Sequence, residues 1–281
     1  MKKVILFLLL FLMAIGIDYE LNSIGLLTVS NGNKLMVLIA SLLLLIYILP
    51  ALFLLSYYEK YFAVPFYLLI IALCFGSFIP GWLAAYGNEL AKSLTDLLAH
   101  GNSFASDWLS ALTASIVEET LKASCAFAII YLFNKQRFSE VFLIGICVGL
   151  GFQILEDLSY IVNQANESMK EVFPQTMVRI SGAVSSHWAY TGLFVLGLFC
   201  IGTKSKKPSL EKIWVWSLSP LILHLLWNSP LNQWMIGDIS VISALLTAIT
   251  LLLIIQTVVY LSQTEKEYLS KKEELRQKFL R

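Results

Sequence analysis

Residues 117–123 read VEETLKA and lie inside a segment, about 108–132, that is otherwise apolar enough to be embedded in lipid. A helix needs about 20 mostly apolar residues to cross the hydrocarbon core of a bilayer, and this segment is that long. Charged side chains at such a depth are costly, and they usually mark a functional site. The segment therefore predicts a transmembrane helix whose two carboxylates and one ammonium group have a function.

The composition of the whole chain is that of an integral membrane protein. Of 281 residues, 58% are hydrophobic and only 14% are charged, and the mean hydropathy is +0.74. Soluble domains average about a quarter charged residues. The net charge of +1 gives no indication of nucleic-acid binding. The four cysteines show no CxxC spacing and are interpreted as buried thiols, not as disulfides or a zinc site: Cys74, Cys125, Cys147 and Cys200.

Hydropathy predicts an all-α, polytopic membrane bundle of about eight transmembrane helices. We divide the chain into N-terminal helices with an outer interfacial helix (1–107), a catalytic four-helix core (108–230), and a last helix with a charged tail (231–281). The first apolar run is short and follows two lysines, so it fits either a span or a signal peptide. The predicted spans are about 4–17, 35–56, 62–86, 108–132, 138–163, 179–202, 213–230 and 237–262.

The distribution of lysine and arginine predicts the orientation of the bundle. With the N-terminus inside, 15 of the 20 basic residues fall in inner segments and 4 in outer ones. Cytoplasmic loops of membrane proteins carry such an excess. Both termini are therefore expected in the cytoplasm. Residues 88–107 carry leucines at helical spacing and suit an outer surface helix, and the charged tail fits a helix on anionic inner-leaflet lipid or one in solvent.

Polar side chains within four predicted spans share one depth and one spacing. In each span two of them are four residues apart, which places both on one helix face. Counted from the outer ends, the pairs begin about 6 to 10 residues in, or some 9–15 Å below the outer boundary. The pairs are Glu118 and Lys122, Glu156 and Tyr160, His187 and Thr191, and His224 and Asn228.

Each polar group alone has a structural explanation, such as a hydrogen-bonded histidine or a self-neutralising ion pair. The GxxxG of Gly145 and Gly149 indicates close helix packing. Together, however, the four sites favour a functional centre in the outer half of the membrane. Carboxylates can act as a base or bind a cation, and imidazoles can hold a metal or donate to an oxyanion. No HExxH or GxSxG motif is present, so a glutamate-activated water, with or without a metal, is the hydrolysis these residues permit.

These residues resemble the motifs of the PrsW family of intramembrane proteases, over roughly residues 108–230. EETLK resembles the EExxK motif, and GFQILEDLSY resembles FxxxE, with Phe152 and Glu156 in place. His187 in RISGAVSSHWAYTG and the pair in HLLWN resemble the last two motifs. Asp157 is a departure, because many relatives have Asn there. It puts the hydrogen bonding beside Glu156 in doubt.

The resemblance implies a superfamily shared with CAAX prenyl proteases, whose members include non-catalytic proteins. It implies cleavage of a single-span membrane protein, such as an anti-sigma factor, on its extracytoplasmic side. The implied catalytic residues are Glu118, Glu119, Lys122, Glu156, His187, His224 and Asn228. Glu118, alone or together with Glu119, is expected to activate water, with Lys122 holding the carboxylates ionised; His224 and Asn228 are expected to stabilise the oxyanion. The supporting residues are Phe152, Asp157, Tyr160, Arg179 and Thr191.

The cofactor stays open at this stage. Glu118, Glu156, His187 and His224 could bind a divalent metal such as zinc, or the enzyme could use none. The expected partners are the lipid bilayer and a single-span protein substrate, with no nucleic acid, and the expected location is the cell membrane as a multi-pass protein. The alternatives are a cation-coupled transporter, for which neither repeats nor interrupted helices are evident beyond a break at Pro80 and Gly81, and a scaffold or immunity protein.

Overall fold

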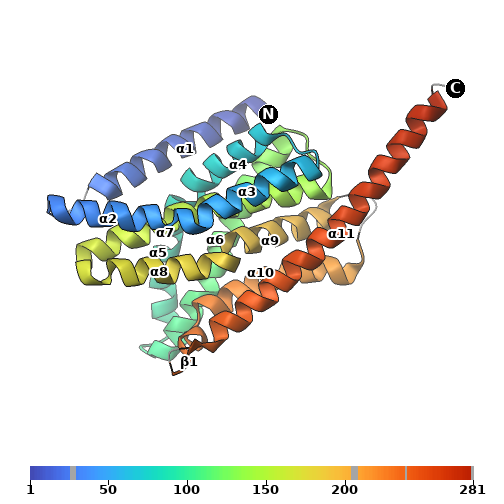
Figure 1. Ribbon diagram of the computed structural model, residues 1–281. Helices are drawn as coiled ribbons and strands as arrows, with labels where there is room; N and C mark the ends of the chain where they lie inside the picture. The colour runs from blue at the N-terminus through green and yellow to red at the C-terminus, as the bar shows by residue number, and fades with distance from the viewer. Residues whose placement is uncertain (26–29, 204–207, 238, 280–281) are drawn as a thin grey trace.

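The computed structural model describes residues 1–25, 30–203, 208–237 and 239–279, with the side chains of Asn31, Ile239 and 267–279 left aside. It is a bundle of helices with one two-stranded ribbon (Figure 1). The prediction of an all-α membrane bundle is confirmed. The elements are α1 (Lys2–Gly25), α2 (Asn31–Leu43), α3 (Leu45–Tyr61), α4 (Phe66–Phe78), α5 (Pro80–Leu98), α6 (Ser103–Leu132), α7 (Phe138–Glu167), α8 (Val172–Gly182), α9 (His187–Gly202), α10 (Leu210–Asn228), β1 (Met235–Ile236), β2 (Ile239–Ser240) and α11 (Val241–Phe279). Short 3₁₀ turns are η1 (Met169–Glu171), η2 (Ala183–Ser185) and η3 (Pro230–Gln233).

Helix α7 is the centre of the bundle and packs between α4 and α9. It is buried along most of its length. Its glycines let its neighbours approach closely: a Cβ at Gly145 would lie 3.0 Å from Gly192 Cα, and one at Gly149 would lie 2.8 Å from Trp188 Cα. The interpretation of the GxxxG as close packing is confirmed. Because Gly149 lies against the first turn of α9, this contact also positions His187.

Within the described residues, six helical stretches are long and apolar enough to cross a membrane: 2–25, 32–61, 66–98, 138–167, 169–202 and 241–266. Helices α6 and α10 correspond to the remaining two predicted spans. Helix α6 is not among these stretches, because the charged residues Glu118, Glu119 and Lys122 lie within its apolar part. The first predicted span is helical and packs against α4, where Gly16 meets the backbone of Phe78.

Three predicted spans are divided between helices. The span 35–56 is divided at Leu44, between α2 and α3. The break at Pro80, expected from its missing N–H, separates α4 from α5. The predicted span 179–202 is not one helix, because η2 and the non-helical backbone of Ser186 (φ −139°, ψ −142°) separate α8 from α9. The expectation of no other interruption was therefore wrong. Arg179 lies on a separate helix and is free to fold back over α7.

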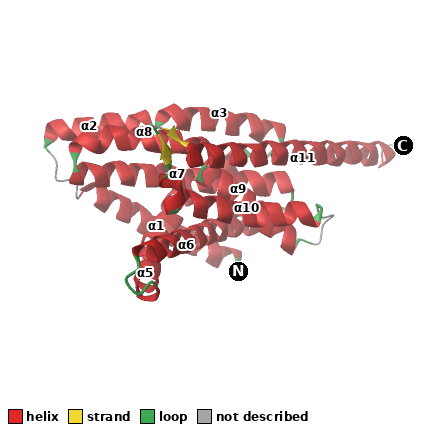
Figure 2. Ribbon diagram, turned by 90° about the horizontal axis from the view of Figure 1, so that it is seen from below, coloured by secondary structure: helices red, strands yellow, loops and turns green. Residues whose placement is uncertain are grey.

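Helix α5 runs across the direction of the long helices in both ribbon views (Figures 1 and 2). It is amphipathic, with Leu90, Leu94 and Leu97 more than half exposed. This stripe matches the expected outer surface helix, although the helix spans Pro80–Leu98 and not 88–107. Residues 103–107 begin α6, whose N-terminus is capped by the side chain of Asn102, which accepts from Ala105 N at 3.1 Å.

Segments predicted to be cytoplasmic gather at one end of the bundle. Lys2 Nζ donates to Leu132 O and Asn134 Oδ1, both at 2.7 Å. At the same end, Arg137 donates to Glu265 on α11. Lys204, Lys206 and Lys207 of the predicted inner loop, and the side chains of the charged tail, lie outside the described residues. The described contacts thus bring segments predicted to be cytoplasmic to the same end of the bundle, and the orientation itself stays a prediction.

Candidate active site

Three charged residues of α6, Glu118, Glu119 and Lys122, are buried in the bundle, and two of them are completely inaccessible. Glu119 and Lys122 are 0% exposed, and Glu118 is 5% exposed. Lys122 Nζ lies 2.6 Å from Glu119 Oε1 and 3.6 Å from Glu118 Oε2. A buried charge needs a partner, because the loss of hydration is otherwise uncompensated. Lys122 is therefore the cation that lets both glutamates remain inside.

Glu119 is held by three groups from three helices. Besides Lys122, it accepts from Thr191 Oγ1 on α9 at 2.9 Å and pairs with His224 Nδ1 on α10 at 3.1 Å. A carboxylate can only accept, so His224 Nδ1 carries the proton in this contact. The other ring nitrogen of a neutral His224 is then an unprotonated acceptor. Glu119 thus sets the tautomer and orientation of His224.

His187, the first residue of α9, is held from both sides. Lys122 Nζ lies 3.0 Å from its Nδ1, and Glu156 Oε2 lies 3.1 Å from its Nε2. Because an ammonium can only donate, Nδ1 accepts and Nε2–H donates to Glu156. The ring of Phe152 packs edge-on to His187 at 5.0 Å between centroids, and Lys122 Nζ lies 4.2 Å from the centre of the same ring.

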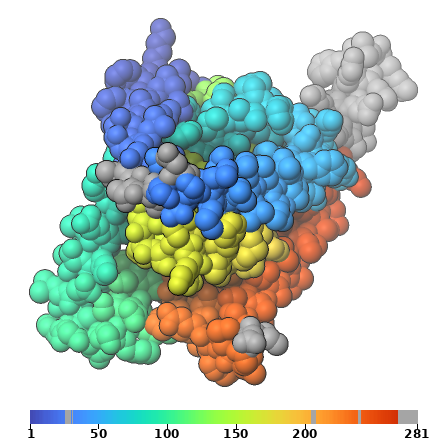
Figure 3. Space-filling view, turned by 60° about the vertical axis from the view of Figure 1, so that its left-hand side comes forward, coloured from blue at the N-terminus to red at the C-terminus, as the bar shows by residue number. Residues whose placement is uncertain are grey.

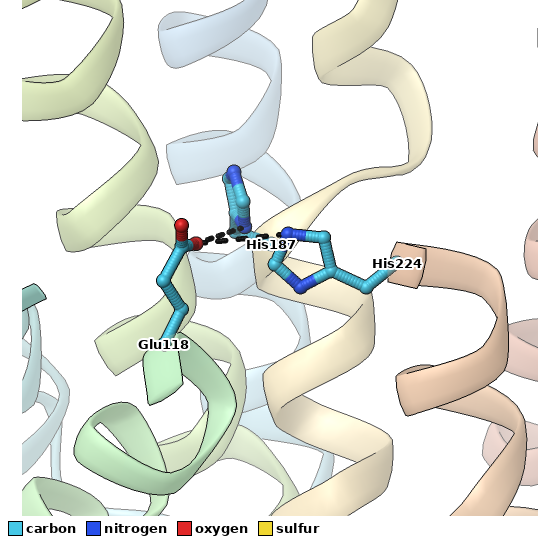
Figure 4. Close-up of side chains that lie close together, drawn as sticks. All are labelled: Glu118, His187 and His224. Atoms are coloured by element: carbon cyan, nitrogen blue, oxygen red, sulfur yellow. Dashed lines mark ion pairs between the residues drawn. The ribbon is translucent and has the colours of Figure 1, made fainter. Parts of the chain in front are cut away.

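Glu118, His187 and His224 converge from three helices (Figure 4). Glu118 Oε2 lies 3.6 Å from His224 Nε2 and 3.9 Å from His187 Nδ1. Both Glu118 Oε2 and His224 Nε2 are buried, and neither has a hydrogen-bond partner within the described part of the chain. Two electron-pair acceptors that face each other repel unless a proton or a cation lies between them. This arrangement therefore favours a bound cation.

The formal charges of the centre point the same way. Four carboxylates (Glu118, Glu119, Glu156 and Asp157) meet two permanent cations, Lys122 and Arg179. Burial of unbalanced charge is strongly unfavourable. A divalent cation would balance the two unmatched charges.

Arg179 of α8 folds over α7 and forms ion pairs with both Glu156 and Asp157. Its guanidinium also lies 4.3 Å from the centre of the Tyr160 ring. Asp157 accepts a further hydrogen bond from Tyr47 Oη on α3 at 2.8 Å. Asp157, the departure from the family pattern, thus serves as an anchor for α8 and α3. The doubt about hydrogen bonding beside Glu156 is resolved by these contacts.

A cavity of about 350 Å³ opens beside these groups. Its wall includes Glu118, Glu156, His187 and His224, together with Asn228, which is exposed at the end of α10. Figure 3 shows the molecule from the side on which the α5–α6 connection (green), α8 (yellow) and the segment after α10 (orange) lie together. The space is large enough for a short stretch of extended peptide and water.

The structure brings together most of the residues predicted from the sequence. Glu119, Lys122 and Thr191 lie behind the cavity. Tyr160 lies in the cavity wall and contacts Arg179. Among the described residues, the group that could hold a metal is Glu118, His187 and His224. Glu156, predicted as a fourth ligand, instead pairs with Arg179 and His187.

Two neighbours of the site were not predicted. Asn88 of α5 donates from Nδ2 to Glu118 Oε1 at 3.1 Å, and Tyr47 reaches Asp157. Asn88 was assigned to a surface helix, and Tyr47 to an unremarkable apolar span. Asn88 is a polar residue two positions before the exposed Leu90, and therefore on the opposite face of α5, which is a signal that could have singled it out.

Comparison with protein families gives one match, to the PrsW family intramembrane metalloproteases, over residues 64–260. This is well over half of the chain. The chain belongs to the PrsW family. It is therefore a multi-pass membrane protease. The match begins at α4 and extends into α11, so the PrsW region is longer on both sides than the 108–230 suggested by the motifs. No curated protein and no solved structure matches the chain.

The three converging residues fit the metal that the PrsW description implies. Zinc binds histidine nitrogen and carboxylate oxygen at about 2.0–2.2 Å, so tetrahedral ligands lie about 3.3–3.5 Å apart. The separations of 3.6 and 3.9 Å from Glu118 Oε2 are close to that range. Histidine ligands commonly donate their second nitrogen to a carboxylate, as His224 does to Glu119. His187 would exchange its contact with Lys122 for the ion.

Proposed function

We propose that the protein is an endopeptidase that cleaves a single-span membrane protein near its extracytoplasmic face. The observation that carries this proposal is the convergence of Glu118, His187 and His224 on one cavity, where two acceptor atoms face each other without a hydrogen-bond partner among the described residues. Glu118 lies 14 residues from the cytoplasmic end of α6, or about 21 Å along the helix. With a hydrocarbon core about 30 Å thick, this distance supports a reaction centre in the outer half of the membrane.

Glu118 is the group best placed to accept a proton from the attacking water. Its Oε2 faces the cavity, and a water at that point would also be within reach of His187 and His224. The water oxygen would attack the scissile carbonyl carbon, and the proton taken by Glu118 would pass to the leaving nitrogen as the C–N bond breaks. A divalent ion held by the same three residues would polarise the water and the carbonyl. With Glu118 engaged by such an ion, Glu156, the second carboxylate in the cavity wall, would take its place as the acceptor of the water proton and pass that proton to the leaving nitrogen.

The remaining site residues prepare this centre. Lys122 keeps Glu118 and Glu119 charged, and Glu119 holds His224 in the required tautomer. Arg179 holds Glu156, which in turn orients His187. The amide of Asn228, in the cavity wall, would donate to the carbonyl oxygen as negative charge develops on it.

The test is N-terminal proteomics on membranes from cells that express the wild type, Glu118→Gln or the control Glu89→Gln at matched levels. Glu89 is exposed on α5, outside the cavity wall. We expect new protein ends near the outer face of single-span proteins with the wild type and with the control, and none with Glu118→Gln. Ends that do not depend on Glu118, or no ends under several envelope stresses, would overturn the proposal in favour of a scaffold.

A further inference from the structure

Glu118 and Glu119 are adjacent in sequence but differ in how firmly they are held. Glu119 has hydrogen-bonded or ionic contacts to Lys122, Thr191 and His224. Glu118 has, among the described residues, a single hydrogen bond, the one from Asn88 Nδ2 to its Oε1 at 3.1 Å. Its contact with Lys122 is longer, at 3.6 Å. The orientation of the Glu118 carboxylate therefore depends on Asn88.

Asn88 belongs to the outer transverse helix α5, and the fit of this helix on α6 delivers it to the site. A Cβ at Gly87 would lie 2.8 Å from Val117 Cγ1, so only glycine allows this approach without displacement. Gly87 is next to Asn88 in the sequence, and Val117 is next to Glu118. The close contact between Gly87 and Val117 therefore brings Asn88 within hydrogen-bonding distance of Glu118. Asn88 Oδ1 is buried beside the cavity and has no hydrogen-bond partner among the described residues.

We propose that Asn88 is a positioning residue for the reaction. By donating to Oε1 it stops rotation of the carboxylate about its last side-chain bond and keeps Oε2 directed at His187 and His224. A neutral amide does this without adding charge to a centre that already has too few cations. The inference rests on the proposed function, because it assigns Asn88 to the Glu118 centre.

The consequence is measurable as metal affinity. Removal of a group that orients a metal ligand typically lowers metal affinity about 10–100-fold. Asn88→Leu keeps the approximate volume but cannot donate. Asn88→Gln keeps the donor on a side chain one methylene longer. Gly87→Ala leaves Asn88 intact but pushes α5 away from Val117.

The experiment is a zinc titration of the full-length protein in detergent micelles, in competition with a chelating indicator. We expect Asn88→Leu to lower zinc affinity about 10–100-fold, with partial recovery in Asn88→Gln. Gly87→Ala should resemble Asn88→Leu, and the exposed Glu89→Gln should bind zinc as the wild type does. Thermal unfolding of each variant shows whether it is folded. A folded Asn88→Leu protein with wild-type affinity would overturn the inference.

The proposed function and the role of Asn88 fail in different ways. Cleavage that is unaffected by Glu118→Gln removes the proposed function, whereas a difference confined to Asn88→Leu concerns the inference alone. If the wild type cleaves its substrate but binds no zinc, kcat provides the readout. Asn88→Leu should then lower kcat at unchanged KM, with recovery in Asn88→Gln. Equal kcat in the two variants and the wild type would overturn the role of Asn88.

Discussion

Two buried clusters of charged residues lie at opposite depths of this bundle, and they are built differently. The inner cluster joins Lys135, Arg137, Glu140 and Glu265, two cations and two carboxylates. In the outer cluster, four carboxylates meet two cations, and two imidazoles complete the group. The inner cluster is balanced in charge, and within the described part of the chain the side-chain oxygens of Glu140 and Glu265 are not among the buried atoms without a hydrogen-bond partner.

The inner cluster is a clamp that holds helices together, whereas the outer cluster has the features of a reaction centre. Arg137 donates to Phe62 O at 2.9 Å, to Ala63 O at 3.0 Å and to Glu265, so it ties the end of α3 to α11. Its partners are carbonyl and carboxylate oxygens that accept its hydrogen bonds. Among the described residues, these contacts leave no ligand atom open to bind a metal. In the outer cluster, Glu118 Oε2 and His224 Nε2 lie beside a cavity and have no hydrogen-bond partner among the described residues. Buried acids indicate chemistry only where their partners are incomplete.

The largest effect that distinguishes the clusters should come from Glu118→Gln. Loss of the proton acceptor should lower kcat for a single-span reporter in proteoliposomes by about 10³-fold. The zinc-dependent rise in melting temperature should vanish as well, because a ligand is lost. Glu265→Gln, the corresponding change in the inner cluster, should retain both. Equal losses of kcat and of zinc-dependent stabilisation in the two variants would mean that the two clusters have the same role.

The next effect should be the instability of Lys122→Met. This change leaves Glu119 charged, fully buried and without its cation, which costs about 3–5 kcal/mol of unfolding free energy. Equilibrium unfolding by SDS in mixed micelles measures it. The double variant Lys122→Met with Glu119→Gln should regain part of the loss, because no unpaired charge remains there. A double variant that is no more stable than the single one would contradict this explanation.

Arg137→Met should have a smaller effect, and on stability alone. The side chain is 23% exposed, and Glu140 keeps its pair with Lys135 at 2.9 Å. The loss of several hydrogen bonds at such a site should lower the unfolding free energy by about 2 kcal/mol. Zinc affinity should be unchanged, since the inner cluster lies far from the ligands. A parallel fall in zinc affinity would show that the clamp also shapes the site.

Tyr47→Phe should have the smallest effect. It removes the hydrogen bond from Tyr47 Oη to Asp157 Oδ2 but leaves the ion pair of Asp157 with Arg179. About 1 kcal/mol of unfolding free energy should be lost. The same SDS titration measures it, with Tyr57→Phe, an exposed tyrosine of the same helix, as control. A loss as large as that of Lys122→Met would make Tyr47 a central support of the site.

The convergence of the site could be predicted because helix periodicity and membrane depth are both encoded locally. Glu118, His187 and His224 lie at similar depths on helices of known direction, so only the helix order was needed to bring them together. The length of α11 could also have been read, because residues 241–279 contain neither glycine nor proline.

Other features depend on tertiary geometry that a single sequence does not show. The separation of α8 from α9 occurs at Ser186, a residue that does not prevent a helix, and it is this break that turns Arg179 toward Glu156. The contact of Asn88 with Glu118 requires the transverse course of α5 and the fit at Gly87. Glu156 lies outside the group that could hold a metal and pairs with Arg179 instead. The position of Arg179 could not be derived from the spacing of residues in the sequence.

Helix α11 continues without interruption past the inner cluster, so one continuous helix joins its two ends. It is held at Glu265 by Arg137 and by Ser139 Oγ at 3.0 Å, and it can tilt about this point. By the helical rise, about 36 Å of rod lie on the outer side, from Val241, and about 21 Å on the cytoplasmic side, to Phe279. The outer end reaches η3, which follows Asn228, through Ser243 and Asn232. A tilt of the helix about Glu265 would move the Val241 end, beside η3, in the opposite direction to the Phe279 end and by more than half as much again.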